Sequence, residues 1–397
     1  MWQIDTDILR VSPASNDLNF IDSLANRTPF FVLTVAYTDT VQIPGVSGAG
    51  VTTELRELTA QADAEIMAHG KARCLPGGVP SNPTGAPGPS IITRAAFDLL
   101  PDMGYVCVDA GLKSPPDVPG TIFPAGAGPA RAVTTGQALG PDESRAGLLF
   151  SEGLRIGREL GRANAERGYL ILAESVPGGT TTALGVLLGL GLDAEQRVSS
   201  SMPGNNTHEL KLQAVRAGLA AFNREKGAFA RQPLGAAASL GDPMQPVVAG
   251  MALAASQFCP VVLAGGTQMA AVLALAAAIY RFPGSGLLAE LPAAQFERIA
   301  LVTTGWVAND PGSDLAGLAA EIETSFGPLG SPYFAANLDF SGSAYPPVQL
   351  YEAGYVKEGV GAGAAALAAM LATGCTAKDL NQAIEAVYRR IVLNEGH

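Results

Sequence analysis

Residues 169–191, YLILAESVPGGTTTALGVLLGLG, predict a strand, a glycine-containing turn and a helix in direct succession. The first five residues form an apolar run of the length of a buried strand. The turn covers residues 174–179, and three threonines lead from it into an apolar helix that ends near residue 190. This order of elements is the repeating unit of a parallel sheet, so it indicates an α/β protein.

The turn of this unit is a candidate anion site. Glycine lets the backbone approach a bound group closely, and the first N–H groups of a helix have no partner within it. Together with the helix dipole they attract an anion, and threonine hydroxyls add donors. The residues expected to bind the anion are Pro177, Gly178, Gly179, Thr180 and Thr181. The alternative is a plain tight turn, because this unit has neither a Gly-Lys-Ser/Thr sequence nor a G-x-G-x-x-G pattern.

The remaining chain repeats the alternation of strands and helices. Apolar runs predict strands at 28–36, 105–109, 260–264, 299–304 and 333–338. Helical patterns predict helices at 52–69, 151–167, 207–222, 240–257, 268–278, 315–325, 360–371 and 377–393. We expect a three-layer α/β fold, in which a mostly parallel sheet carries helices on both faces, together with a small helical lobe. Residues 1–397 are expected to form a single domain, whose lobe comes from the N- and C-terminal segments.

Polar residues and glycines that follow the predicted strands are expected at one edge of the sheet. In parallel sheets, ligands bind beyond the carboxyl ends of the strands. Glu174 ends the strand of the first unit, and a Gly-Gly-Thr turn follows the strand at 260–264. The residues expected at this edge are Glu174, Gly265, Gly266, Thr267, Ser341 and Ser343. Lys211, on the helix at 207–222, either points into the same cleft or lies on a solvated helix face.

A second carboxylate, Glu358, lies on a glycine-flanked turn in an otherwise apolar segment. It is either a charge partner for the start of the following helix or a desolvated acid/base group with a raised pKa. The proline- and glycine-rich residues 75–90 exclude regular structure and predict a long loop. That loop either closes over a pocket or is a plain surface connection.

The composition excludes several classes of protein. The 397 residues carry a net charge of −11, which makes nucleic acid and anionic membranes poor partners. The mean hydropathy of +0.22 is high. However, Pro260 and Gly265 interrupt the uncharged segment 243–280, so its apolar runs are shorter than the roughly 20 residues of a membrane span. The four cysteines are far apart and the three histidines lack metal-ligand spacing. We expect a cytoplasmic protein with free thiols, no metal and no cofactor.

Four segments form an ordered set of motifs: ESVPGGTT at 174–181, residues 249–276, SGSA at 341–344 and KEGVGA at 357–362. Together they resemble the nicotinate-nucleotide–dimethylbenzimidazole phosphoribosyltransferase family. That family has E-x-G-x-G-N-T-T, a segment ending in P-V-V-L-D-G-F, S-A-E-P-G-H and G-E-G-S/T-G-A at the corresponding places. The resemblance extends over about residues 151–371, and the N-terminal part is more similar to a branch of the family found in archaea and cyanobacteria.

The resemblance implies a reaction and the residues that perform it. Nicotinate mononucleotide would transfer its phosphoribosyl group to 5,6-dimethylbenzimidazole, giving nicotinate and an α-ribazole-5′-phosphate-type product for cobalamin (cobamide) lower-ligand synthesis. Glu174 would stabilise the positive charge that develops at C1′, and Glu358 would accept the ring proton of the incoming base. The 5′-phosphate would be held by residues 177–181, the turn 265–267, the serines and Lys211. The resemblance also implies a homodimer, in which the glycine- and alanine-rich helix at 360–371 is a candidate interface.

The chain departs from the family's motifs mainly on the side of the base. Val176 and Gly179 replace a glycine and the asparagine of the first loop, and Ala264 replaces the aspartate of D-G-F. The histidine of S-A-E-P-G-H is absent. The acceptor base therefore stays open, with adenine and phenols as alternatives to benzimidazole. The alternative to an enzyme is a non-catalytic nucleotide-binding or regulatory protein that retains the fold.

Overall fold

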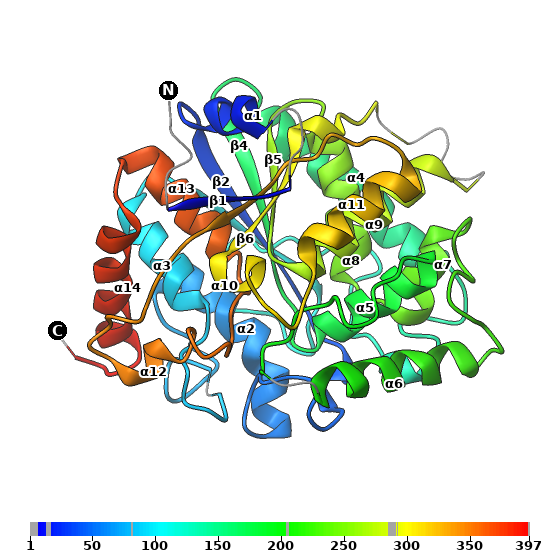
Figure 1. Cartoon of the computed structure of the whole chain (residues 1–397), viewed down its shortest axis with the longest axis horizontal. Helices are drawn as coiled ribbons and strands as arrows, with labels where there is room; N and C mark the ends of the chain where they lie inside the picture. The colour runs from blue at the N-terminus through cyan, green and yellow to red at the C-terminus, as the bar shows by residue number, and fades with distance from the viewer. Residues whose placement is uncertain are drawn as a thin grey trace.

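A computed structural model describes residues 7–12, 17–80, 82–203, 206–284, 291 and 293–395. Its centre is a seven-stranded sheet in the order β1-β7-β6-β5-β4-β2-β3 (Figure 1). The strands are β1 (Ile8–Ser12), β2 (Thr28–Ala36), β3 (Gly104–Gly111), β4 (Gly168–Ser175), β5 (Val261–Ala264), β6 (Ile299–Thr304) and β7 (Tyr333–Ala336). Neighbouring strands are parallel except for β1, which pairs antiparallel with β7. The predicted mostly parallel sheet is confirmed.

Helices cover both faces of the sheet, which gives the three predicted layers (Figure 1). One face carries α4 (Ser144–Ala163), α5 (Gly179–Leu190), α6 (Asn206–Ala220), α7 (Pro233–Leu240), α8 (Met244–Ala255), α9 (Thr267–Arg281) and α11 (Leu315–Phe326). The other face carries α1 (Asp17–Leu24), α2 (Thr53–His69), α3 (Ser90–Leu99), α13 (Ala362–Thr373) and α14 (Ala377–Ile391). The short helices α10 (Gly305–Ala308) and α12 (Pro346–Gln349) lie in connections.

Helices from the two ends of the chain share the second layer. There α3 packs against both α13 and α14, and α13 also packs against β6 and β7. Residues 362–371 of α13 are all buried within this one chain. This helix therefore has no free face for a dimer interface, and the expectation that it forms one is wrong.

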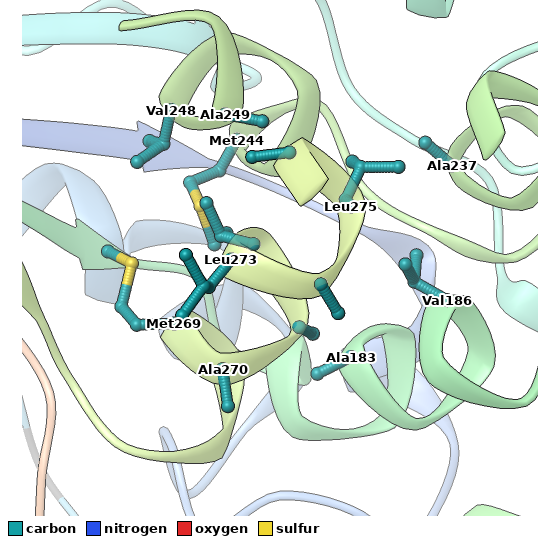
Figure 2. Close-up of a cluster of buried hydrophobic side chains, with 14 of the residues drawn as sticks. Ala183, Val186, Ala237, Met244, Val248, Ala249, Met269, Ala270, Leu273 and Leu275 are labelled. Carbon is teal, nitrogen blue, oxygen red and sulfur yellow. The ribbon is translucent and has the colours of Figure 1, made fainter. Parts of the chain in front are cut away.

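Side chains alternate between two hydrophobic cores, one on each face of the sheet. In β4, Leu170 and Leu172 belong to the core with α4, α5, α8 and α9, whereas Ile171 and Ala173 belong to the core with α2, α3 and α13. A strand that is buried on both faces reads as a continuous apolar run, which is why the sequence reveals it. Figure 2 shows part of the first core, where apolar side chains of α5, α8 and α9 gather.

Helix α4 lies very close to α8 because glycines of α4 face it. A Cβ atom added at Gly157 would lie 2.4 Å from the carbonyl oxygen of Met251, and one added at Gly153 would lie 2.2 Å from that of Val247. The two backbones therefore meet with no side chain between them, as close packing of a core allows. Apolar helices buried in this way account for the high mean hydropathy. Within the described ranges, none of the helices has the length and apolar character needed to cross a membrane.

Some elements differ from the expectation. Strand β1 and helices α1, α3 and α7 occupy segments for which none was predicted. The first turns of α4 extend the helix back to Ser144 and bury Leu149 and Phe150. The predicted helix at 240–257 is shorter, because residues 241–243 separate α7 from α8. Helix α7 is buried on all sides and alanine-rich, so it lacks the polar face by which a helix is recognised.

Replacing Gly157 by alanine is expected to destabilise the protein by about 1–3 kcal/mol, because the new Cβ would overlap the Met251 carbonyl and push α4 from α8. Gly147→Ala on the same helix is the matched control. Its Cβ would come no closer than 3.8 Å to Leu234, and alanine favours the helix by up to about 1 kcal/mol. Urea denaturation measures both free energies of unfolding, and equal stability of the two variants would contradict the close contact.

Candidate active site

An open pocket lies at the carboxyl edge of the sheet, beyond the end of β4. Its empty volume is about 1110 Å³, its mouth included. Walls come from the turn after β4, residues 199–202, the start of α9 and residues 355–360. A further wall consists of residues 47–49, α2 and parts of the loop between α2 and α3. The proline-rich loop therefore lines the pocket, which favours a loop that closes over a pocket rather than a plain surface connection.

Glu174 is buried at the end of β4 and lines this pocket. One carboxylate oxygen accepts a hydrogen bond from the backbone N–H of Val176 at 3.0 Å, and the other accepts one from the side-chain amide of Gln268 at 3.1 Å. Burial is the main cause that raises the pKa of Glu174 to about 8, and the charges of Asp242 and Glu358 raise it further. In the free protein, Glu174 is therefore largely protonated at neutral pH.

Glu358 reaches the same pocket from the segment between α12 and α13. One oxygen accepts a hydrogen bond from the Thr303 hydroxyl at 3.0 Å, and the other accepts from the backbone N–H groups of Gly359 at 3.1 Å and Gly363 at 3.3 Å. Burial raises the pKa of Glu358 to about 7, and these hydrogen bonds oppose the rise. Both expected roles therefore apply in part, since Glu358 contacts the start of α13 and is also suited to accept and release a proton.

The backbone joins the two segments that carry these carboxylates. The N–H of Val360 donates a hydrogen bond to the carbonyl oxygen of Glu174 at 2.9 Å. The two side chains thus share one pocket although they come from distant parts of the chain. Two carboxyl groups with raised pKa values in one cavity are typical of sites that move protons and stabilise charge.

Two glycine-containing turns form the adjoining wall of the pocket. Gly178 has a φ of 83°, a left-handed conformation that favours glycine, and α5 begins at the next residue. Helix α9 begins at Thr267, directly after the second turn. The predicted residues that line the pocket at these turns are Pro177, Gly178, Gly179, Thr180, Gly266 and Thr267. Two helix starts at the wall of one pocket are suited to bind an anion.

Other predicted site residues do not line the pocket. Thr181 and Gly265 are buried next to residues that do. Ser341 is exposed, and the Ser343 hydroxyl donates a hydrogen bond to Glu385 of α14 at 2.6 Å. The serines that line the pocket are instead Ser47, Ser175 and those of the segment 199–201.

Lys211 is neither on the pocket wall nor on a solvated helix face. It is fully buried, and its ammonium group donates hydrogen bonds to the carbonyl oxygens of Val198 at 3.2 Å and Ser199 at 2.8 Å. Burial lowers its pKa to about 7. Lys211 therefore holds the backbone at the start of the segment 199–201 without lining the pocket itself.

A buried ion pair holds the segment that carries Glu358. The Lys357 ammonium lies 2.5 Å from the Asp310 carboxylate, and the two side chains are only 6% and 9% exposed. The same carboxylate accepts a hydrogen bond from the Ser199 hydroxyl at 2.9 Å. The pair therefore ties the segment 355–360 to the segment 199–202, which forms another wall of the pocket.

The backbone around Glu358 is strained. Val356, Lys357 and Val360 have φ values of 65°, 62° and 52°, a left-handed conformation that is uncommon for any residue except glycine and rarest for β-branched valine. Such conformations persist only where the surroundings impose them, and they cluster at functional sites. Here the Thr304 hydroxyl donates to the carbonyl oxygen of Lys357 at 2.6 Å, and the Thr93 hydroxyl donates to that of Val360 at 2.8 Å.

Sequence reasoning did not single out Asp63, Gln268, Asp310 or Lys357. For Asp63 the sequence gives a signal, because this charged residue lies among Ala60, Ala62 and Ala64 in a segment predicted to be a helix. Lys357 and Asp310 give no local signal, since their pairing depends on the fold.

Comparison with known proteins finds relatives along most of the chain. The UPF0284 protein of Gloeobacter violaceus is 44% identical over 351 residues, which are 88% of this chain and 85% of that protein. The UPF0284 protein of Synechocystis sp. is 42% identical over 373 residues, 94% of each chain. That of Methanothermobacter thermautotrophicus is 39% identical over 356 residues, 89% of this chain and 90% of its own length. No family model matches the chain.

Two solved structures share the fold. CobT from Thermus thermophilus superposes with a TM-score of 0.56 at 20% identity, over 96% of this chain and 91% of that one. The nicotinate-nucleotide–dimethylbenzimidazole phosphoribosyltransferase from the same organism gives a TM-score of 0.53 at 18% identity, over 97% and 92% of the chains. At these identities the likeness concerns the fold, and the resemblance expected from the motifs is confirmed at that level.

Asp310→Asn is expected to destabilise the protein by about 3–5 kcal/mol, because it leaves the Lys357 ammonium buried without a counter-charge. The double variant with Lys357→Met should recover part of this loss, since no charge then remains unpaired. Glu159→Gln breaks an exposed pair with Arg155 and is the matched control, with an expected cost below about 1 kcal/mol. Chemical denaturation gives all three free energies. A cost for Asp310→Asn no larger than the control would contradict the structural role of the pair.

The raised pKa of Glu174 predicts a dependence of stability on pH. Between its ordinary pKa of 4.5 and about 8, the folded state retains a proton that the unfolded state releases, so this group lowers stability as pH rises. Glu174→Gln removes that contribution. The melting temperature of the variant relative to that of the wild type should therefore rise as pH increases from about 5 to about 8. Glu152→Gln is the control, because the pKa of Glu152 is lowered, chiefly by hydrogen bonding with Arg155, and should give no trend in this range. Parallel pH curves for the wild type and Glu174→Gln would be inconsistent with a protonated Glu174.

Proposed function

This chain belongs to the UPF0284 family, and from that membership, its fold and its pocket we propose that it is a phosphoribosyltransferase. The donor is nicotinate mononucleotide, and the acceptor is a nucleobase such as 5,6-dimethylbenzimidazole. The products are nicotinate and an α-ribazole-5′-phosphate-type ribotide, a precursor of the cobamide (cobalamin) lower ligand. The observation that carries the proposal is the presence of Glu174 and Glu358 in one pocket beside two glycine-lined helix starts.

In the proposed reaction the bond between C1′ and the pyridinium nitrogen breaks, and its electron pair returns to the ring, which leaves as nicotinate. Positive charge develops at C1′, and the Glu174 carboxylate stabilises it. Glu174 is mostly protonated in the free protein, but a cationic pyridinium beside it favours the ionised form.

The acceptor completes the exchange on the other side of C1′. The lone pair of one ring nitrogen forms the new C1′–N bond, and the ring N–H proton passes to the Glu358 carboxylate and then to solvent. Because the pKa of Glu358 is about 7, the group is a base strong enough to accept this proton and weak enough to release it. Each bond formed is thus matched by one broken, and no redox partner is needed.

The 5′-phosphate binds at the starts of α5 and α9. Gly178, Thr180, Gly266 and Thr267 supply backbone N–H groups there, and the two threonines add hydroxyls. A fixed phosphate positions C1′ for attack. Lys211, Ser341 and Ser343 would reach the phosphate only after the segments around them move.

We further propose a homodimer, on the basis of the resemblance alone, and a cytoplasmic location, on the basis of the four widely spaced cysteines. The buried α13 does not supply the interface. Within the described residues, no group of three His, Cys, Asp or Glu side chains is arranged to hold a metal ion. The proposed partners are small molecules, as the fold suggests, and a second copy of the chain.

Glu358→Gln is expected to lower kcat by about 10²- to 10⁴-fold, because it removes the proton acceptor. In the wild type, kcat should rise with pH through about 7 as Glu358 ionises, and the variant should lose this limb. Chromatography of released nicotinate measures turnover with dimethylbenzimidazole, adenine and phenols. Glu159→Gln, outside the pocket, is the control with unchanged turnover.

Two results would overturn this assignment. Absence of turnover with every acceptor, or turnover unaffected by Glu358→Gln, would refute the enzyme. Binding of nicotinate mononucleotide that survives both Glu174→Gln and Glu358→Gln without product would instead favour a non-catalytic nucleotide-binding protein. Isothermal titration distinguishes these cases.

A further inference from the structure

A third carboxyl group, Asp63 of α2, lines the pocket and has no part in the reaction described above. It is 4% exposed, and it accepts a hydrogen bond from the Ser175 hydroxyl at 2.8 Å. Ser175 follows Glu174 in β4, so this hydrogen bond fixes Asp63 close to the reacting end of the pocket.

Asp63 is buried without a counter-charge. None of the ion pairs found among the described residues includes it. Burial raises its pKa to about 7, and the hydroxyls of Ser175 and Ser90 oppose the rise. The buried residues Ala60 and Ala64 on the same helix show that small apolar side chains suffice for packing in this layer. A buried carboxyl group costs free energy, and in a pocket this indicates a role toward a ligand.

Asp63 and the phosphate-binding turns belong to opposite faces of the sheet. Ala173 lies in the core with α2, and Ser175, two residues further along β4, points to the same face. The turns that precede α5 and α9 belong to the layer on the other face. A nucleotide whose phosphate rests on those turns therefore extends across the edge of the sheet toward α2.

The base end of the ligand would thus meet a wall in which polar side chains lie among Pro80, Pro83 and Pro89. Thr59, one helical turn before Asp63, lines the pocket together with Asn82 and Thr84 of the loop. Glu358 precedes α13 in the same layer and lines the same pocket, so a base that gives its proton to Glu358 would lie on the side of the pocket that carries Asp63. Dimethylbenzimidazole has one ring N–H, which goes to Glu358, and its remaining edge carries methyl groups. Methyl groups against Asp63 would leave the carboxyl group only its hydrogen bonds from Ser175 and Ser90 and none from the ligand, which disfavours such a base.

We propose that Asp63, oriented by Ser175, selects an acceptor base that carries a second N–H donor, an aminopurine such as adenine, over dimethylbenzimidazole. The exocyclic amine donates to the Asp63 carboxyl group and is not consumed. The ring N–H proton goes to Glu358 as before. Carboxylates accept hydrogen bonds from exocyclic amines of bases in the same way in nucleic-acid recognition. This inference rests on the proposed phosphoribosyl transfer and specifies its acceptor class.

The test compares the two bases with nicotinate mononucleotide as donor. The wild type is expected to use adenine with a kcat/KM at least about 10-fold above that for dimethylbenzimidazole. Asp63→Ala should lower kcat/KM for adenine about 10- to 100-fold and change the value for dimethylbenzimidazole less than about 3-fold. Ser175→Ala is the matched variant, because it breaks the same hydrogen bond between α2 and β4 but keeps the carboxyl group. It should weaken the preference for adenine without abolishing it.

Each contrary result has a defined meaning. If Asp63 only fastens α2 to β4, both variants will lower the two kcat/KM values equally, and the selection is refuted. A wild type that prefers dimethylbenzimidazole also refutes the selection. This comparison holds even if the melting temperature of Asp63→Ala shows that the variant does not fold. Nicotinate release with dimethylbenzimidazole alone rejects only the role of Asp63. Failure to release nicotinate with any base rejects the proposed function itself.

Discussion

Burial of carboxyl groups without counter-charges is the constraint on which this pocket depends. Glu174, Glu358 and Asp63 all lie at the carboxyl edge of the sheet, and burial raises the pKa of each toward neutrality. Each unit of such a shift corresponds to about 1.4 kcal/mol between the two protonation states. The two apolar cores on either side of the sheet must offset this cost, which explains why so much of the chain is fully buried around one small polar site.

The surroundings hold the carboxyl groups by bonds that cross between segments. The hydrogen bond from Val360 to Glu174 and the ion pair of Lys357 with Asp310 connect three walls of the pocket. The left-handed residues near Glu358 show that these contacts outweigh local backbone preference. The geometry of the pocket is therefore set before a ligand arrives, which is how electrostatic stabilisation is most effective.

The sequence predicts a feature where the residues that determine it are close together in the chain, and it fails where they are far apart. Strands β2 and β6 agree with the expected bounds, because a strand buried on both faces is an unbroken apolar run. Glu174 and the turn after it were found because strand, turn and helix are adjacent in the chain. Lys211 was misplaced because helical spacing cannot tell a buried amine from a solvated one. The places of Ser343 and Lys357 depend on α14 and on Asp310, and no local pattern contains those contacts.

The charge distribution explains how an acidic protein could orient the proposed donor, which carries both an anionic phosphate and a cationic pyridinium ring. Helix starts rather than lysines line the proposed anion side of the pocket, so a phosphate bound there would be held by backbone dipoles. The carboxyl groups occupy the other side, where the proposed donor carries its cationic pyridinium ring. Once the glycosidic bond breaks, that ring is neutral and its own carboxylate is repelled by the same groups. The site would therefore lose its attraction for nicotinate as the reaction proceeds, which would favour release of nicotinate once the phosphoribosyl group has passed to the bound base.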